Sequence, residues 1–271
     1  MKTFDFNIHF SALGAVARPH LTSDETRMGP DDLAACYALQ RAGIKDAVGA
    51  ANFMLFNQAL FFGAGAADFM DGVRRDLPGS TFTALIDFRR EDAVSAVDSA
   101  AAQGVRGLKF HSYFQRIAEE DFPTALALAQ RAQERGMFVC VDASYGTSGM
   151  YRFDNLRLAC LLADALTCPI VLLHSGGLRV FEAMLLAEEH PHVILETSFS
   201  LNYYRGSSVE EDLRWVYRKL GPHRLVYGSD HPYIDLAQAA QDCRRTLEKI
   251  GFDEVAVEAV MWQNATALVR G

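Results

Sequence analysis

The stretch MFVCVDASYGTSGMYRFDNLRLACLLADALTCPIVLLHSGG, residues 137–177, decides the fold. It contains an apolar run that ends in an acid at Asp142, an amphipathic segment over 155–166, and a second apolar run that ends at His174. Short apolar runs are typical of strands buried on both faces, and the amphipathic segment between them is typical of a helix. The stretch therefore predicts a strand–helix–strand unit with parallel strands.

The same alternation continues through the chain in both directions. The candidate strands begin near Thr3, Ile44, Thr81, Val105, Met137, Pro169, His192 and Arg224. The candidate helices cover 31–41, 56–76, 91–103, 121–136, 155–166, 178–190, 208–220, 236–249, 253–261 and 264–269. Eight strands, each followed by a helix, predict an α/β fold, a (β/α)8 TIM barrel that takes residues 1–271 as a single domain.

The main rival is an open, doubly wound parallel sheet. Such sheets typically carry a glycine-rich phosphate-binding loop after their first strand. Here the first candidate strand is followed by FSALGAVARP at 10–19, and no GxGxxG or Walker pattern occurs there or elsewhere in the chain. The sequence favours the barrel.

Composition limits the partners. The chain has 271 residues, half of them hydrophobic, and a formal net charge of −8 from 26 basic and 34 acidic side chains. Nucleic acid and anionic membrane surfaces attract basic proteins, so we expect neither as a partner. The apolar stretches fall short of the roughly 18 residues that a membrane span needs. The N-terminus MKTFD lacks the apolar run of a signal peptide.

The cysteines are odd in number and scattered, without a CxxC pair. They are Cys36, Cys140, Cys160, Cys168 and Cys243. This spacing indicates reduced, mostly buried thiols rather than a disulfide framework or a zinc site. We therefore expect a cytosolic protein whose partner is a small molecule.

Polar residues end several candidate strands, where the active site of such a barrel lies. Strict alternation along the first strand places Phe4, Phe6, Ile8 and Phe10 toward the helices, and Asp5, Asn7 and His9 toward the barrel interior. The other strand ends carry Lys109, His111, Asp142, His174 and Asp230. Buried charges must pair or bind something, so this convergence indicates a functional site. The orientation of Glu196, Thr197 and Ser198 on the seventh strand stays open.

This pattern resembles the amidohydrolase superfamily, and within it the amidohydrolase-2 group of metal-dependent TIM-barrel hydrolases. The matching text is DFNIH at 5–9, GLKFH at 107–111, LHSGG at 173–177 and YGSDHP at 227–232, with NA at 264–265. Each motif is short, and their order and spacing along the chain make the resemblance specific. The group includes decarboxylases similar to aminocarboxymuconate semialdehyde decarboxylase and lactonases similar to 2-pyrone-4,6-dicarboxylate lactonase.

The resemblance implies a metal site that this chain has altered. The family's first strand offers His-x-His, and here Asn7 takes the first position while His9 keeps the second. The fifth strand offers a histidine, which is Asp142 here, while His174 and Asp230 match the family. The remaining set of His9, Asp142, His174 and Asp230 suits one divalent ion, Zn or else Mn or Fe.

Two mechanisms follow, and both use Asp230 as the general base. With a metal, the ion lowers the pKa of its bound water, Asp230 accepts the proton, and His174 and Lys109 polarise the scissile carbonyl. The alternative is metal-free, as in the resembling lactonases. Asp142 then pairs with Lys109 or His174, and the cations Lys109, His111 and His174 hold the oxyanion.

The leading function is hydrolysis of a lactone, ester or amide bond in a small organic substrate. Nonoxidative decarboxylation of an unsaturated or aromatic acid is an alternative, because the same barrel supports both reactions. A catalytically inactive relative that binds a ligand is a third, because two of the usual histidines are absent.

Further residues are candidates for substrate binding. Arg152 follows the fifth strand, and Tyr203 and Arg205 follow the seventh, on loops that should reach the barrel mouth and could recognise an anionic or aromatic acid. Lys109 could bind a substrate carboxylate, form a structural ion pair or be carbamylated. His111 could contact the substrate or be a core histidine.

Two apolar segments, 53–56 and 60–62, flank the expected start of the second long helix. Core packing is one use for them. A contact between copies of the chain is the other, because exposed apolar patches mark interfaces.

Overall fold

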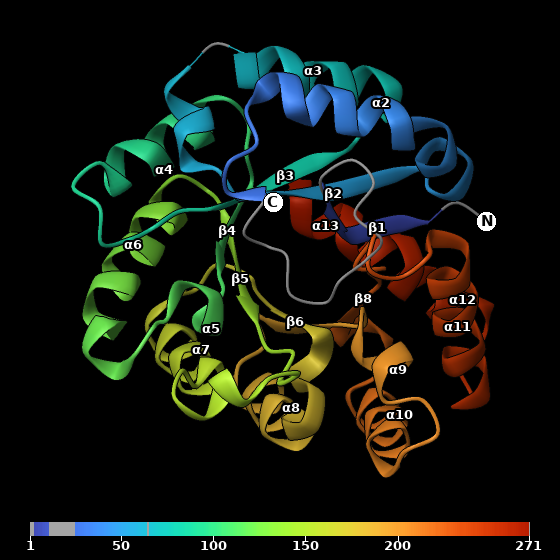
Figure 1. Ribbon diagram of the computed structural model, residues 1–271. Coiled ribbons are helices and arrows are strands. Elements are labelled where there is room, and N and C mark those ends of the chain that lie inside the picture. Colours follow the sequence, from blue (N-terminus) through green and yellow to red (C-terminus); the bar gives the residue numbers. More distant parts are fainter. Residues whose placement is uncertain (1–2, 11–24, 64, 271) are drawn as a thin grey trace.

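Eight parallel strands form the centre of the molecule, in the order in which they occur in the chain. The computed structural model describes residues 3–10, 25–63 and 65–270. Its strands are β1 (Phe4–His9), β2 (Ala50–Leu55), β3 (Thr81–Leu85), β4 (Gly107–Phe110), β5 (Phe138–Asp142), β6 (Ile170–Leu173), β7 (Val193–Glu196) and β8 (Leu225–Val226). Helices surround these strands in Figure 1. The predicted TIM barrel is confirmed.

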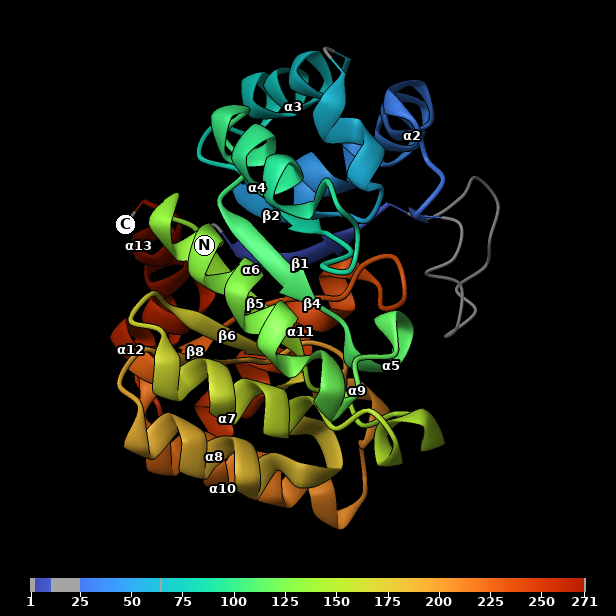
Figure 2. The ribbon, with the colours of Figure 1, turned by 90° about the vertical axis from the view of Figure 1, so that its left-hand side faces the viewer.

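Most of the helices cover the outside of the barrel, and the last one packs across the end where the strands start. The helices are α2 (Pro30–Ala47), α3 (Gly65–Asp76), α4 (Ala93–Ala102), α5 (Ser112–Gln115), α6 (Phe122–Glu134), α7 (Asn155–Ala165), α8 (Val180–Glu189), α9 (Ser200–Tyr203), α10 (Ser208–Leu220), α11 (Leu236–Lys249), α12 (Glu254–Glu258) and α13 (Asn264–Arg270). In Figure 2, α6, α7 and α8 lie side by side along the barrel wall. The short helices α5 and α9 follow the carboxyl ends of β4 and β7, where they border the site described below.

Local sequence signals fix several helix starts. Asp154, Asp235 and Asp253 precede α7, α11 and α12, and each side chain accepts hydrogen bonds from backbone N–H groups of the first turn. An N-cap of this kind satisfies donors that have no partner within the helix. The predicted starts at residues 155 and 236 therefore agree with the structure.

Hydrogen bonds between β1 and the segment after β8 close the barrel. The backbone N–H of Asp230 donates to the carbonyl of Asn7 at 2.9 Å, and that of His9 donates to the carbonyl of His231 at 2.7 Å. This pairing brings Asp230 and His9 to the same edge of the barrel.

Apolar side chains fill the barrel interior. The inner cluster includes Phe4, Phe6, Ala50, Met54, Leu85, Phe138, Cys140, Val171, Leu173 and Val226. A larger apolar layer lies between the strands and the helices. The interior is thus a packed core rather than a channel.

The alternation predicted for β1 is wrong in its first half. Phe4 and Phe6 belong to the inner cluster, and only Ile8 and Phe10 pack in the outer layer as expected. Asp5 is fully buried and lies on the strand face opposite to Phe4 and Phe6, away from the barrel interior.

A bulge in β1 causes this reversal. Asp5 pairs with Ala51, and the next pair along the ladder joins Ile8 to Phe53, so β1 advances three residues while β2 advances two. The extra residue shifts the alternation by one position. His9 therefore faces the interior, as predicted, although the first half of the strand does not follow the expected pattern.

The second strand begins later than predicted. Ile44 lies in α2, which passes through Gly43, and β2 starts at Ala50. A glycine inside a helix costs only about 1 kcal/mol, and the full burial of Ile44 in the outer layer offsets it. The helix predicted over 56–76 is divided into a short turn, Gln58–Phe62, and α3.

The apolar segment 53–56 belongs to the end of β2. Phe53 packs in the outer layer, and Met54 and Phe56 pack in the inner cluster. In the segment 60–62, only Phe62 is half exposed. Core packing therefore accounts for most of both segments, and self-association stays a prediction.

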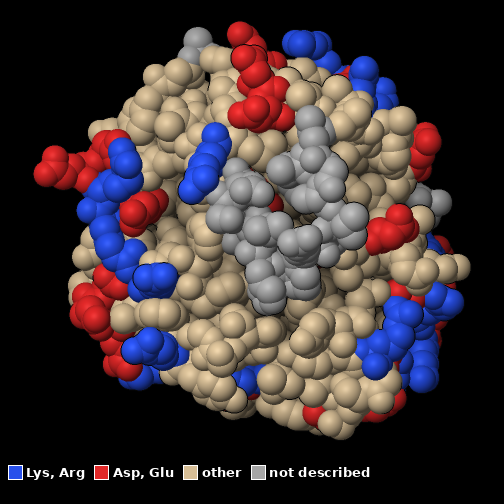
Figure 3. All heavy atoms as spheres, viewed as in Figure 1, with Lys and Arg blue, Asp and Glu red and all other residues tan. Residues whose placement is uncertain are grey.

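The molecular surface carries charges of both signs. On the face in Figure 3, basic and acidic side chains are interspersed around the rim. In the part of the chain that the structure describes, no helix is long and apolar enough to cross a membrane. The expected cytosolic location and the absence of nucleic-acid partners stay predictions.

Candidate active site

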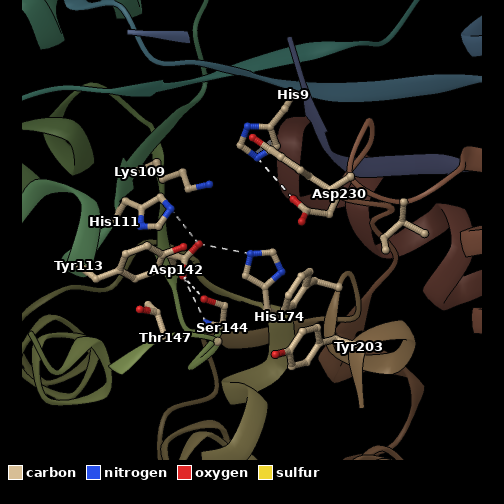
Figure 4. Close-up of a pocket in the computed structure, with 14 residues that line it drawn as sticks. His9, Lys109, His111, Tyr113, Asp142, Ser144, Thr147, His174, Tyr203 and Asp230 are labelled. Carbon is tan, nitrogen blue, oxygen red and sulfur yellow. Dashed lines mark hydrogen bonds and ion pairs between the residues drawn. The ribbon is translucent and has the colours of Figure 1, made fainter. Parts of the chain in front are cut away.

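A cavity of about 300 Å³ lies at the carboxyl ends of the strands (Figure 4). Its described lining consists of His9, Lys109, His111, Tyr113, Asp142, Ser144, Gly146, Thr147, His174, Phe199, Tyr203, Asp230, Tyr233 and Ile234. Asn7 does not line it, and the Nδ2 of Asn7 donates to Oδ1 of Asp230 at 3.1 Å. The other polar residues that the sequence places at the ends of β1, β4, β5, β6 and β8 meet in this one cavity.

Asp142 is the centre of one cluster. Its Oδ2 lies 3.4 Å from Nε2 of His111 and 3.2 Å from Nε2 of His174. Its Oδ1 accepts hydrogen bonds from the backbone N–H and the hydroxyl of Ser144. Burial opposes ionisation of this carboxyl, but the two imidazoles outweigh it and hold the pKa of Asp142 well below its usual range.

The ring of His174 is held at both nitrogens. Opposite Asp142, its Nδ1 lies 2.9 Å from Oγ of Ser198, and that hydroxyl donates to Oε2 of Glu196 at 2.7 Å. Because its proton goes to Glu196, the hydroxyl can only accept from His174. Burial disfavours a charged ring, but Asp142 outweighs it and raises the pKa of His174 to about 9. His174 is therefore an imidazolium at neutral pH.

Ser198, His174 and Asp142 follow one another like the members of a catalytic triad. Ser198 is buried and does not line the cavity, so it orients the ring and does not attack a substrate. Glu196 points inward beneath it and also accepts from the backbone N–H of His174. A Cβ atom at Gly228 would lie 2.1 Å from Oε1 of Glu196, so only glycine leaves room for this carboxyl.

His9 and Asp230 form a second cluster (Figure 4). Nε2 of His9 lies 3.5 Å from Oδ1 of Asp230, and Nδ1 lies 3.0 Å from Oε2 of Glu25. Burial, followed by the positive charge of Lys109, lowers the pKa of His9 to about 3. The ring is therefore neutral at pH 7, and Asp230 is the acid that faces the cavity beside it.

Lys109 contributes an ammonium group to the cavity. Its side chain is 1% exposed, and its Nζ lies 5.0 Å from the centroid of the Phe56 ring. Among the described residues, no carboxylate lies within ion-pair distance of its ammonium group. Of the two partners expected for Asp142, Lys109 and His174, the structure pairs it with His174. The charge of Lys109 is thus available to a ligand.

His111 differs from the expectation that it is a cation. Burial lowers its pKa to about 3 despite the neighbouring Asp142, so the ring is neutral. Its Nδ1 is buried without a hydrogen-bond partner in the described part of the chain. Its ring packs against the ring of Tyr113, with the two centroids 4.4 Å apart. His111 can therefore donate to Asp142 but cannot supply positive charge to an oxyanion.

Comparison with known families gives the assignment. Residues 13–271 match the amidohydrolase family model. The chain belongs to the amidohydrolase family. The resemblance seen in the sequence is confirmed, and the family places the chain among hydrolases. No curated protein matches the chain.

Solved structures support the fold of this family member. A probable 2-pyrone-4,6-dicarboxylic acid hydrolase from Acinetobacter baumannii, with citric acid bound, is 14% identical, with a TM-score of 0.64 over 100% of both chains. An uncharacterised TIM-barrel protein from Bordetella bronchiseptica is 15% identical, with a TM-score of 0.67 over 100% of this chain and 99% of that one. N-isopropylammelide isopropylaminohydrolase from Burkholderia multivorans is 18% identical, with a TM-score of 0.65 over 98% of this chain and 74% of that one. At these identities the likeness shows the fold alone.

Members of the amidohydrolase superfamily commonly hold a divalent metal, but the donors in this family member fit one poorly. A catalytic zinc site needs three protein ligands around one point. The predicted donors instead form two pairs, His9 with Asp230 and Asp142 with His174. The amide of Asn7 donates to Asp230. Within residues 3–10, 25–63 and 65–270, no three His, Cys, Asp or Glu side chains are grouped so as to hold an ion.

The structure brings only one of the three loop candidates to the cavity. Tyr203 lines it, at the end of α9. Arg205 forms an ion pair with Asp242 on α11, outside the cavity. Arg152 is exposed at the end of the turn Ser148–Tyr151 and does not belong to the described lining.

Several site residues escaped the sequence analysis. The missed lining residues are Tyr113, Ser144, Gly146, Thr147, Phe199, Tyr233 and Ile234. Most of them follow a predicted strand-end residue by two to five positions, and this nearness is the signal that could have found them. Glu25 is different, because nothing in the sequence ties it to β1.

Proposed function

We propose that this family member hydrolyses a lactone or ester bond in a small carboxylic acid without a bound metal ion. The observation that carries the proposal is the pairing of acid and histidine on two sides of one cavity. His9 lies 3.5 Å from Asp230 on one side, and His174 lies 3.2 Å from Asp142 on the other. The first pair offers a base, and the second offers an imidazolium held as an ion pair with Asp142; acyl transfer to water uses both a base and positive charge.

The steps follow from the positions of these groups. Asp230 takes a proton from a water molecule as the water oxygen attacks the carbonyl carbon. The imidazolium of His174 stabilises the negative charge on the carbonyl oxygen through its field, because its N–H groups are engaged by Asp142 and Ser198. When the intermediate collapses, the bond between carbon and the leaving oxygen breaks, and that oxygen takes the proton from Asp230. A lactone thus gives a hydroxy acid.

The cavity suits a planar substrate with a carboxylate. Lys109 offers an ammonium group. The rings of Phe199 and Tyr203 stack on each other with centroids 4.9 Å apart at the cavity wall, where they can pack against a flat apolar group. One structural relative is named as a hydrolase of a pyrone dicarboxylic acid, which agrees with a carboxylate-bearing substrate.

A substrate panel tests the proposal. Purified protein is incubated with lactones, esters and amides, each with and without a carboxylate, and products are separated by chromatography. Hydrolysis of carboxylate-bearing lactones or esters supports the proposal. Release of CO₂ from unsaturated acids would support the decarboxylase alternative instead, and binding without turnover would support the inactive relative.

Metal removal is a second test. We expect well below one equivalent of Zn, Mn or Fe per chain, and activity unchanged by dialysis against a chelator, because the donors pair with one another. Elemental analysis and rates before and after chelation measure this. One equivalent of metal, with activity lost on its removal and restored on its return, would contradict the metal-free mechanism.

Lys109→Met is expected to raise KM for a carboxylate-bearing substrate about 10- to 100-fold, since a charge-assisted hydrogen bond contributes about 1.5–3 kcal/mol. KM for the neutral analogue should stay within about twofold. Lys45→Met, at a half-exposed lysine of α2, is the matched control. An equal fall in kcat for both substrates would place Lys109 at the reacting carbonyl instead.

A further inference from the structure

Glu25 contacts His9 at the ring nitrogen that does not face Asp230. Its side chain is buried, with 3% of the residue exposed. Its Oε2 lies 3.0 Å from Nδ1 of His9, and its Oε1 accepts a hydrogen bond from the hydroxyl of Tyr233 at 3.3 Å. Neither the sequence motifs nor the comparisons assign a role to this carboxylate.

The two distances at His9 determine which nitrogen holds the proton. Nδ1 is 3.0 Å from Glu25, within the normal range of an N–H···O hydrogen bond. Nε2 is 3.5 Å from Asp230, beyond that range. The proton therefore belongs on Nδ1, and the lone pair of Nε2 faces Asp230 and the cavity.

We propose that Glu25 is a positioning residue that fixes the Nδ1-protonated form of His9, so that Nε2 can accept a hydrogen bond from the attacking water. The inference rests on the proposed function. Nε2 of His9 and Oδ1 of Asp230 are close enough for one water molecule to donate to both. A water held this way has its oxygen lone pairs directed at the substrate, which lowers the entropic cost of the attack.

Tyr233 connects the same carboxylate to the other half of the pair. The backbone N–H of Tyr233 donates to the carbonyl of Asp230 at 2.9 Å, and its ring meets the His9 ring edge-on at 5.7 Å. Glu25 thus touches His9 directly and the Asp230 segment through Tyr233. A carboxylate that orients a histidine through its second nitrogen is a recurring arrangement in catalysis.

The test observes the proton itself and needs no substrate. The protein is labelled with ¹⁵N-histidine, and the tautomer of His9 is determined by NMR, its signals being those lost in His9→Gln. We expect a protonated Nδ1 in the wild type and in Glu25→Gln, whose amide oxygen still accepts. In Glu25→Leu the proton should move to Nε2. Glu91→Leu, at an exposed acid, is the matched control and should leave His9 unchanged.

Kinetics give the second readout. Misplacement of a reacting group can cost about 100-fold in rate, so Glu25→Leu should lower kcat by about 10- to 100-fold with little change in KM. Glu25→Gln should recover most of the loss. A role in stability alone would lower the yield of folded protein and leave kcat per folded molecule intact.

Two results would overturn the inference. One is an unprotonated Nδ1 of His9 in the wild type, and the other is the same His9 tautomer in the wild type and in Glu25→Leu. If Glu25→Leu does not fold, Glu25→Ala, which also removes the acceptor, takes its place in the same comparison. Failure of the substrate panel would overturn the proposed function but would leave the NMR result standing, so the two failures are distinguishable.

Discussion

Asp230→Asn is expected to lower kcat about 10³-fold while the protein stays folded. Asp230 is the cavity acid beside His9, and asparagine keeps its shape but cannot take a proton from water. General base catalysis contributes about 10²- to 10⁴-fold, which sets the size of the loss. Rates with the best substrate of the panel, together with circular dichroism and thermal unfolding of the variant, measure both parts of the prediction.

The matched control for this variant is Asp235→Asn. Asp235 lies on the same segment but caps α11 by accepting from the backbone N–H of Gln238. Asparagine caps helices about as well as aspartate, so activity and stability should both be preserved. A rate near that of the wild type in Asp230→Asn would rule out this residue as the base in either mechanism.

Asp142→Ala is expected to cost about 3–5 kcal/mol in the free energy of unfolding. The change leaves the imidazolium of His174 buried without its counter-charge, and breaking a buried pair in this way costs about that much. Two hydrogen bonds from Ser144 are lost with it. Urea unfolding measures the effect. Adding His174→Leu to the variant should recover part of the loss, because the unpaired charge is then removed.

Asp164→Ala offers a matched control on the surface. Asp164 lies 3.5 Å from His190, and 66% of its side chain is exposed. Exposed pairs contribute about 0–1 kcal/mol, so this variant should unfold nearly like the wild type. Equal losses in the free energy of unfolding for the two variants would mean that the buried Asp142 pair contributes no more to stability than an exposed pair.

The cost of Asp142→Ala should depend on pH. The pKa of His174, about 9, is above its ordinary 6.5, so its contribution is complete below pH 6.5 and is lost as the pH rises through 9. The pKa of Asp142 is below its ordinary 3.8, so its contribution is complete above that value and is lost on acidification. The difference in the free energy of unfolding between Asp142→Ala and the wild type should be largest between about pH 4 and 6.5 and should shrink toward pH 9.

The sequence predicts the barrel well where one strand resembles the next. Apolar runs that end in Asp142 and His174 identify both the strand and the end of it that meets the cavity, because parallel strands in a barrel share one orientation. The failures lie where tertiary contacts override local signals. Gly43 does not end α2, because burial of Ile44 compensates for it, and the β1 bulge depends on pairing with β2 that no local pattern records.

The candidate site divides in the same way. Strand-end residues such as Lys109 and Asp230 were predicted because strand geometry carries them to the cavity. Loop residues follow no such rule, and Arg205 turns to Asp242 instead. The sequence could not predict the protonation states either. The neutral His111 and the charged His174 differ only in the groups that surround them in the folded protein.

The extra residue in β1 separates two tasks within a single strand. Before it, Phe4 and Phe6 close the base of the barrel; after it, His9 faces the cavity. In a regular strand, side chains at even and odd positions face opposite sides of the sheet. Without the extra residue, Phe4 and Phe6 could not share the barrel interior with His9. Substitutions at Phe4 and Phe6 can therefore change the barrel core without changing the direction of the His9 side chain, provided that the extra residue in β1 is kept.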